Sequence, residues 1–517
     1  MCQMAHSRPR SSASSKFAYI AGGRYFEMGS KTPPLGGVLC YNKKIRESML
    51  KDFFTSVGDI IIELFKQWEV WVVLFLAGFA GIFFILPLGL QGTAWGILWG
   101  VIKLTWWIWA FLAMWKLFLS IWLFWRQSIF QKEIQWTVWE ICIPRSNEKG
   151  AEAMESILLA MHGLTNAAGD PKERWWDGEI TRPLSLEIAS FGGEVHFYLR
   201  GYCKVANIIE ANFHSHYPDV ELLQIEDYIN RLPQNLEEIY SQGKDIYGGE
   251  LILEDEPVIP LKTYKQFMND PAEEKRTDPM GAIIELLGKL EPGEIAAIQI
   301  VLEGARSDWT ITAKKYIEEF KEKTSGRHVT TTEEGTQTTI NVRTPGETDL
   351  LKEMEANIGK VVFNTMIRAL YISKQEGFYD AYPRRGIRSV FNQYSGVNRN
   401  KFDWHEPQLT RAKIWYFPYL FPRLRVEFRK QRLMIDFFER NLPWETFMSK
   451  LLTSHPMNLN FSMKTSVLNT EAIASLFHPP TDIVLTAPHI PRQESRRAGP
   501  QAGIQIFGDD IDIEKYQ

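Results

Sequence analysis

Lysine and arginine residues concentrate in one stretch of the sequence, residues 374–432, where they could hold an anionic ligand. Thirteen Lys and Arg residues fall there, against five Asp and Glu residues, with Tyr382, Trp404 and Trp415 among the aromatic residues between them. Stacking plus phosphate pairing suits single-stranded nucleic acid, and the same charges would attract anionic lipid headgroups. A solvated or partner-facing surface is the interpretation that we favour. The candidate residues are Arg384, Arg385, Arg388, Arg423, Arg425, Arg429, Lys430 and Arg432.

Signatures of nucleotide binding and hydrolysis do not accompany these cations. A P-loop needs GxxxxGK[ST], because backbone amides, the lysine and the hydroxyl must all reach the phosphates or their metal. Each Gly-Lys pair of the sequence precedes Asp, Leu or Val instead, at Lys244, Lys289 and Lys360. GxSxG, HExxH and GxGxxG are absent as well. We therefore expect a protein that is not an enzyme and has no cofactor.

Histidines and cysteines do not have the spacing of a metal site. His214 and His216 would diverge on a helix, so we expect a surface or helix-end role for both. His478 precedes two prolines and is expected at the C-terminal end of a helix. The four cysteines are scattered, without a CxxC pair, which fits a reducing compartment.

Two apolar runs upstream, residues 68–90 and about 94–125, predict a transmembrane helical hairpin. Each run has the roughly 20 residues that a membrane helix needs, and LTWWIWAFLAMWKLFLSIWLFW (104–125) carries six of the 18 tryptophans. Lys and Arg flank the pair of runs but are absent from the link, so both termini are expected in the cytoplasm. Lys116, inside the second run, is expected to snorkel or to pack on the partner helix; the role of Lys103 stays open.

The rest of the chain after residue 130 predicts α/β structure. Strands are expected at 134–144, 183–191, 194–200 and 220–228, with helices at 151–164 and 203–218. This βαββαβ order is the ferredoxin-like one. A second block of helices and strands follows, with strands expected at 294–304 and 360–373. The predicted fold class is α+β, with a two-helix transmembrane hairpin followed by a cytoplasmic part of ferredoxin-like (βαββαβ) modules.

Composition divides the chain into seven predicted segments. They are a disordered cytoplasmic N-terminus (1–44), an amphipathic interfacial helix (45–66), the transmembrane hairpin (67–126), a first α/β domain (130–235), an acidic connector (236–275), a second α/β domain (276–480) and a C-terminal tail (481–517).

Four stretches together resemble one family. SLEIASFGGEVHFYLR, ANFHSHYPDVELLQIEDY, VLNTEAIASLFHPPTDIVLTAPHIPR and the later GIQIFG resemble the front portion of bacterial membrane-anchored type IV secretion and conjugation ATPases of the TraC/HerA kind. The resemblance spans about 130–508 and the preceding hairpin. In that family a RecA-like P-loop motor follows, and here GDDIDIEKYQ stands about where the motor would begin. The resemblance therefore implies the membrane-anchored portion without the motor.

These observations predict a non-catalytic scaffold or accessory subunit of a type IV secretion-like translocation machine, held in the bacterial inner membrane as a multi-pass protein. Its expected partners are the lipid bilayer and a separately encoded P-loop ATPase, with further copies of the chain as a possible third. The alternative is a membrane-tethered protein that binds nucleic acid through residues 374–432.

Overall fold

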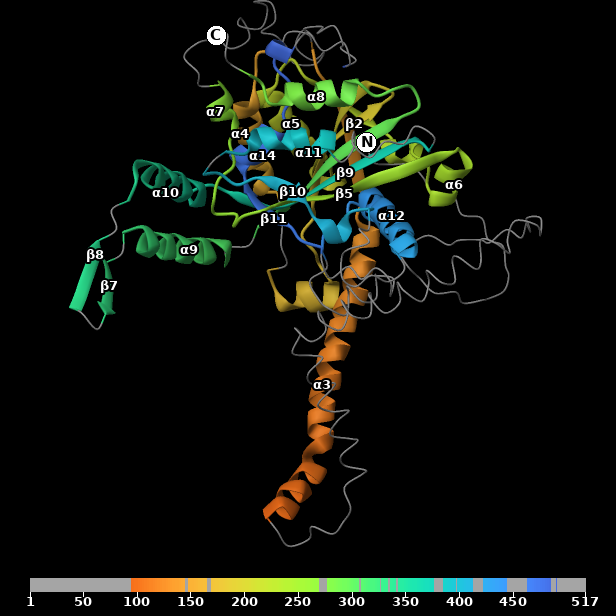
Figure 1. Cartoon of the computed structure of the whole chain (residues 1–517). Coiled ribbons are helices and arrows are strands. Elements are labelled where there is room, and N and C mark those ends of the chain that lie inside the picture. Colours follow the sequence, from red (N-terminus) through yellow and green to blue (C-terminus); the bar gives the residue numbers. More distant parts are fainter. Residues whose placement is uncertain are drawn as a thin grey trace, which may run out of the picture. The chain divides into compact units, whose positions relative to one another are not determined.

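One antiparallel sheet of nine strands runs through the part of the chain that the structure, a computed structural model, describes (Figure 1). The described residues are 94–144, 147–164, 169–268, 277–305, 308–325, 327–332, 335–340, 343–375, 385–396, 398–411, 422–443, 463–484 and 490.

The strands of this sheet follow the order β10-β5-β9-β6-β2-β3-β1-β4, and β11 pairs with β9 beside the end of β5. Their bounds are β1 Trp136–Cys142, β2 Leu184–Phe191, β3 Glu194–Tyr202, β4 Glu221–Ile225, β5 Lys244–Leu253, β6 Ile295–Gly304, β9 Val362–Lys374, β10 Phe402–Trp404 and β11 Ser466–Asn469. A separate hairpin pairs β7 Arg327–Thr332 with β8 Gly335–Ile340.

The helices that the structure describes lie between these strands, apart from α3, which precedes β1, and α14, which follows β11. Their bounds are α3 Ala94–Glu133, α4 Ala151–His162, α5 Ala206–His216, α6 Leu236–Ser241, α7 Tyr264–Met268, α8 Met280–Gly288, α9 Asp308–Ser325, α10 Pro345–Ile358, α11 Ile387–Phe391, α12 Pro422–Glu439 and α14 Thr470–Leu476.

Helices cover both faces of the sheet, because successive side chains along a strand point to opposite sides. In β2, Leu186 and Ile188 belong to the larger hydrophobic core, whereas Ala189 belongs to the smaller one. Residues of α4, α5, α8, α11 and α14 complete the larger core, and α6 and α12 contribute to the smaller. We call these two sides the α14 face and the α12 face.

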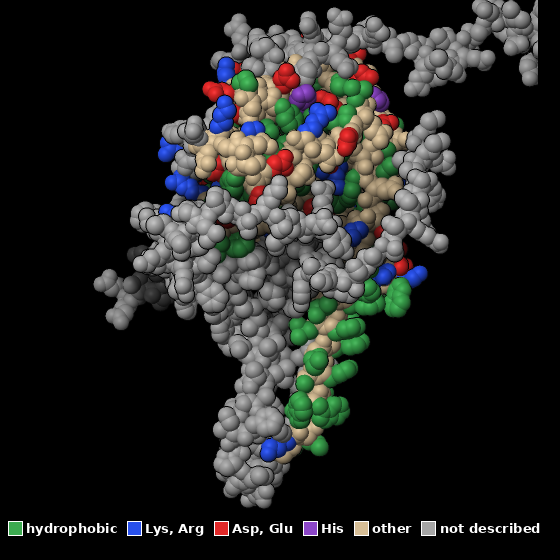
Figure 2. Space-filling model, turned by 90° about the vertical axis from the view of Figure 1, so that its right-hand side faces the viewer, with side chains coloured by type: hydrophobic (Ala, Val, Ile, Leu, Met, Phe, Trp, Pro, Cys, Tyr) green, Lys and Arg blue, Asp and Glu red, His purple; other side chains and the backbone are tan. Residues whose placement is uncertain are grey.

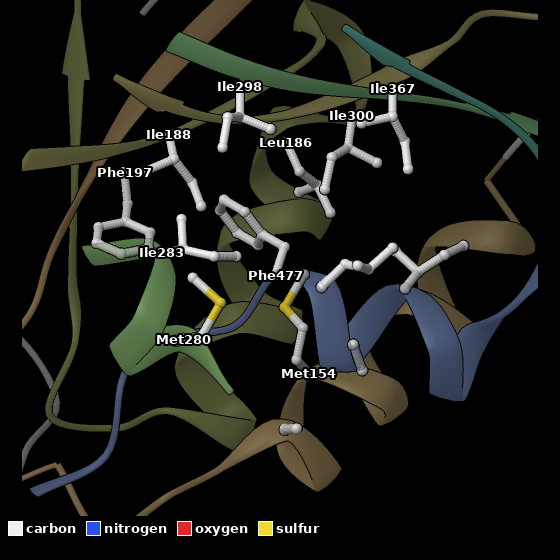
Figure 3. Packing of buried hydrophobic residues seen from close by; sticks show 14 of the residues in the cluster. Met154, Leu186, Ile188, Phe197, Met280, Ile283, Ile298, Ile300, Ile367 and Phe477 are labelled. Atoms are coloured by element: carbon white, nitrogen blue, oxygen red, sulfur yellow. The ribbon is translucent and has the colours of Figure 1, made fainter. Parts of the chain in front are cut away.

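The α14 face is closed by the fully buried segment around Phe477, at the end of α14. Figure 3 shows Phe477 between the sheet residues Leu186 and Phe197 and the helix residue Met154. The rings of Phe477 and Phe197 lie 5.8 Å apart, edge to face, a favourable arrangement for aromatic pairs. The stretch that contains LFHPP in the sequence is therefore part of the core.

The Gly192-Gly193 turn between β2 and β3 is the hairpin turn that the sequence predicts. Their φ angles are 62° and 97°, and two successive positive φ values at the centre of a two-residue hairpin are the reason that glycine is favoured there. The strand pairs adjoining it run from Phe191↔Glu194 to Ser185↔Arg200.

The predicted ferredoxin-like modules do not exist as separate bodies, and this part of the predicted fold class is wrong. β2 and β6 pair along their length, from Leu184↔Leu302 to Phe191↔Ile295, so both blocks share one sheet and one core on each face. The order β2-β3-β1-β4 on one side of this seam is repeated as β6-β9-β5-β10 on the other. Residues 236–275, predicted as an acidic connector, contain β5, an interior strand.

The predicted transmembrane hairpin is also wrong. Among the described residues, none of the helices combines the length and the apolar composition that crossing a membrane requires. The second predicted run lies in α3, whose apolar composition is reduced by Lys103, by Lys116 and by tryptophans, which are amphipathic. The multi-pass inner-membrane location with two cytoplasmic termini, inferred from that hairpin, is corrected with it. The ranges 1–44, 45–66 and 68–90 lie outside the described residues.

Candidate functional site

The structure separates the predicted basic residues instead of gathering them on one surface. Arg384 lies outside the described residues. Arg385 precedes α11 and is exposed, while Arg388, in α11, forms an ion pair with Asp403 at 3.1 Å. Ile387 and Phe391 pack α11 into the core of the α14 face.

The remaining predicted cations lie on α12, which packs on the opposite side of the sheet. Arg423 is exposed and Arg425 is half-buried. The guanidinium of Arg429 donates to the carbonyl oxygens of Glu406 and Leu409. Lys430 is buried and donates to Asp245 at 2.6 Å, and Arg432 is buried against Asp436 at 3.0 Å. Binding of nucleic acid by residues 374–432 stays an untested prediction.

His214 and His216 lie at the C-terminal end of α5, as the sequence predicts, with His214 exposed. Within the described ranges, no group of three or more His, Cys, Asp or Glu side chains is arranged to hold a metal ion.

A row of buried polar side chains crosses four adjacent strands on the α12 face. Glu187 in β2 lies opposite Gln299 in β6, Gln299 opposite Arg368 in β9, and Arg368 opposite Glu250 in β5. Each of the four is at most 2% exposed. Because a buried charge is costly unless it is paired, this row must be neutralised within the fold.

Arg440, directly after α12, neutralises one end of the row. Its guanidinium contacts both carboxylate oxygens of Glu187, at 2.8 and 3.2 Å, and both of Asp227, at 2.5 and 3.0 Å. The backbone of Arg440 has φ 54°, the left-handed region that a non-glycine residue rarely adopts. The chain therefore accepts local strain where α12 ends and this side chain turns into the sheet.

The pKa values in this network agree with a fixed set of charges. Burial alone would lower the pKa of Arg440, but Glu187 and Asp227 raise it above its usual value. Burial likewise would raise the pKa of Asp227, and the hydrogen bonds and charge of Arg440 lower it. Tyr228 donates to Glu187, and burial together with that carboxylate raises the tyrosine pKa well above its usual value.

Arg368 performs the same role at the other end of the row. It is fully buried and pairs with Glu250 at 3.1 Å, and it also donates to the backbone carbonyl oxygens of Asp436 and Asn441. Both ends of the row are thus held by residues in or directly after α12. Burial raises the pKa of Asp436, against the opposing charges of Arg432 and Arg368.

A pocket of about 100 Å³ opens beside this network, between the C-terminal end of α3 and the α12 face. Gln127 and Gln131 of α3, Trp136 of β1, Arg200 of β3 and Arg440 line it, together with Ile180, Thr181, Pro183, Glu303, Glu439, Asn441, Leu442 and Pro443. The pocket has a volume large enough for a small molecule.

The base of α3 is fixed beside this pocket by the segment Glu173–Asp177. Trp122 donates its indole N–H to the carbonyl oxygen of Trp175 at 2.7 Å, and Arg126 donates to that of Trp176. Gly178 then turns the chain with φ 72°, and a Cβ at this position would meet the backbone of Arg126. A side chain at 178 would therefore push the segment off α3.

Beyond this base, α3 exposes apolar side chains. Val101, Leu104, Trp107, Phe111, Met114, Phe118 and Trp125 are each more than half exposed, and Figure 2 shows the apolar side chains in green along the helix. Contiguous exposed apolar surface of this kind is uncommon on monomeric soluble proteins.

A buried contact between His478 and Asp278 holds the segment after α14. Nδ1 of His478 lies 2.8 Å from the carbonyl oxygen of Ala474, which places the ring at the helix end as the sequence predicts, and Nε2 lies 3.1 Å from Asp278. Burial would raise the pKa of Asp278, but His478 and the backbone N–H groups of Thr481 and Met280 lower it to about 2.

We expect the Asp278→Asn variant to lose part of the acid sensitivity of the protein. The pKa of Asp278 is lower in the folded chain than its unfolded value of about 3.9, so the carboxylate stabilises the fold above pH 4, and this contribution disappears as the pH falls towards 2. Over that interval the variant should lose about 2 kcal/mol less of its free energy of unfolding than the wild type. Urea denaturation at several pH values measures this difference, and parallel pH profiles would refute the assignment.

The sequence contains a signal for this network that is not a motif. Glu187 and Arg368 each interrupt an otherwise apolar strand, in SLEIASF and MIRALY. A charge in the middle of such a strand must have a buried partner.

Residues 131–401, just over half of the chain, match one protein-family model. The matched range contains β1 to β9 and stops before β10, α12 and α14. No curated protein matches the chain. These comparisons lend no support to type IV secretion or conjugation, and that assignment is withdrawn. The chain belongs to the family described as Domain of unknown function (DUF8128).

Proposed function

We propose that this protein is a non-catalytic assembly subunit that associates with further copies of itself through α3. The observation that carries the proposal is the exposed apolar stripe of α3, defined as Val101, Leu104, Ile108, Phe111, Trp115, Phe118, Trp122 and Trp125. Successive members are three or four residues apart, which is the a/d spacing of helices that pack together.

Two features of the stripe favour a second copy as its occupant. Lys103 and Lys116 lie off the stripe, so two stripes can meet without placing like charges in contact. The C-terminal end of the stripe is already used for packing, since the Trp122 ring lies 5.9 Å from that of Trp176 in the same chain. The apolar surface continues from this packed end towards Val101.

The resemblance to translocation ATPases concerns the framework of the fold. Three of the four stretches that carry it correspond to β2 and β3, to α5 and β4, and to β11 and α14, which are framework elements. They supply a framework and not an exposed docking surface. Docking of a separately encoded P-loop ATPase stays an untested prediction.

Light scattering coupled to size exclusion tests the proposal on the full-length chain. We expect the wild type to elute as an oligomer and the Phe111→Glu, Phe118→Glu double variant as a monomer. Burying unpaired carboxylates in the helix interface should raise the dissociation constant more than about a hundredfold.

A matched control is available on α9. Ile311 is 72% exposed but lies far from the stripe in sequence, so Ile311→Glu should leave the oligomer intact. A monomeric wild type, or a double variant that assembles like the wild type, would refute self-association through α3.

A further inference from the structure

The pocket at the base of α3 contains an arginine whose hydrogen-bonding groups are unused. Arg200 is only 9% exposed, and it stacks on Trp136, with the guanidinium carbon 3.9 Å from the ring centroid. Among the described residues, Arg200 has neither a hydrogen-bond acceptor nor an ion-pair partner within contact distance. A guanidinium carries five N–H donors, so a set of donors lines this wall of the pocket.

Burial of the Arg200 charge is costly. Burial, and after it the charge of Arg440, lower the pKa of Arg200 to about 9, although Glu187 and Asp227 act in the opposite direction. The neighbouring Arg440 differs from Arg200, because its guanidinium forms ion pairs with two carboxylates, those of Glu187 and Asp227. An anionic ligand that accepts hydrogen bonds from Arg200 would offset this cost.

We propose that this pocket binds a small carboxylate anion, which pairs with Arg200 through both of its oxygens. Planar carboxylates match the fork of a guanidinium and form two parallel hydrogen bonds with it. Trp136 already holds the guanidinium plane by stacking, so the side chain is oriented before a ligand arrives. Gln127, Gln131 and Thr181 line the same pocket and offer further polar contacts.

The other charges of the lining favour a single negative charge on the ligand. Glu303 and Glu439 also line the pocket, and like charges within a few ångströms repel each other. A phosphate, with its second negative charge, would be opposed more strongly than a carboxylate. Ile180 and Leu442 provide apolar lining for a short hydrocarbon chain, so butyrate is a suitable probe. This inference does not depend on self-association through α3.

Equilibrium dialysis of radiolabelled butyrate against the full-length chain tests the site directly. We expect saturable binding of one butyrate per chain, weakened at least about tenfold by Arg200→Met, because the charged hydrogen bonds are lost. Acetate should compete less well than butyrate, by up to about fourfold for each methylene that it lacks. Inorganic phosphate should not compete at equal ionic strength.

Arg182→Met is the matched control. Arg182 also stacks on aromatic rings, those of Phe130 and Tyr202, but it pairs with Glu179 and is not part of the pocket lining. Arg200→Lys keeps the charge without the fork, and it should fold normally and bind butyrate weakly. Absence of saturable binding, competition by phosphate, or equal binding by wild type and Arg200→Met would each overturn the proposal.

Discussion

Replacing Arg440 by methionine should lower the free energy of unfolding by about 3–5 kcal/mol, the range observed when one partner of a buried ion pair is removed. Glu187 is completely buried, and Arg440 contacts both of its oxygens. Without the guanidinium, the carboxylate of Glu187 stays buried with no other cation of the described residues in an ion pair with it, and Asp227 loses its ion-pair partner as well. Chemical denaturation followed by circular dichroism measures the loss.

Two further variants test whether the loss of stability comes from the unpaired buried carboxylate. Arg423→Met changes an exposed arginine of α12, the helix that precedes Arg440, and we expect a change within about 0.5 kcal/mol. Combining Arg440→Met with Glu187→Gln should recover part of the loss, because the second change removes the unpaired charge. If Arg440→Met costs less than about 1 kcal/mol, the polar row is not the buried ion network described above.

A second large effect is expected at Phe477 on the opposite face. Phe477→Ala should cost about 3–5 kcal/mol, since the ring is fully buried against Phe197 and its removal leaves a cavity. Phe477 lies outside the range that matches the family model, so the result also tests whether the C-terminal segment is part of the folding unit.

The control for Phe477 lies on α4. Leu159 belongs to this helix but is 54% exposed, so Leu159→Ala should cost less than about 0.5 kcal/mol. Similar, small losses in both variants would mean that the segment around α14 is dispensable for the fold.

The sequence predicts individual elements better than their assembly. Short runs of apolar residues placed β2, β3, β6 and β9 close to their observed bounds, because strands that are packed on both faces are apolar along most of their length. The pairing of β2 with β6 joins residues more than a hundred positions apart, and nothing in either strand specifies that neighbour. β5 was missed because Gly248 and Gly249 and the acids after Leu253 are typical of a connector.

The candidate site was predicted least well, because it too depends on which distant residues the fold brings together. A count of charges along residues 374–432 suggests one basic surface, yet α11 and α12 pack on opposite faces of the sheet. Lys430 and Arg432 are instead buried, and they pair with Asp245 and Asp436. Glu187 and Arg440 are 253 residues apart in the chain, so only the folded structure shows that they form a pair.

Self-association through α3 is tested most directly by disulfide cross-linking at the middle of the stripe. Trp115 is near its centre, so a cysteine at this position lies close to its counterpart whether two helices pack parallel or antiparallel. In a background without the native cysteines, Trp115→Cys should give a covalent dimer under mild oxidation, whereas Lys116→Cys, on the outer side, should stay monomeric. Equal cross-linking at both positions, or none at position 115, would contradict the account.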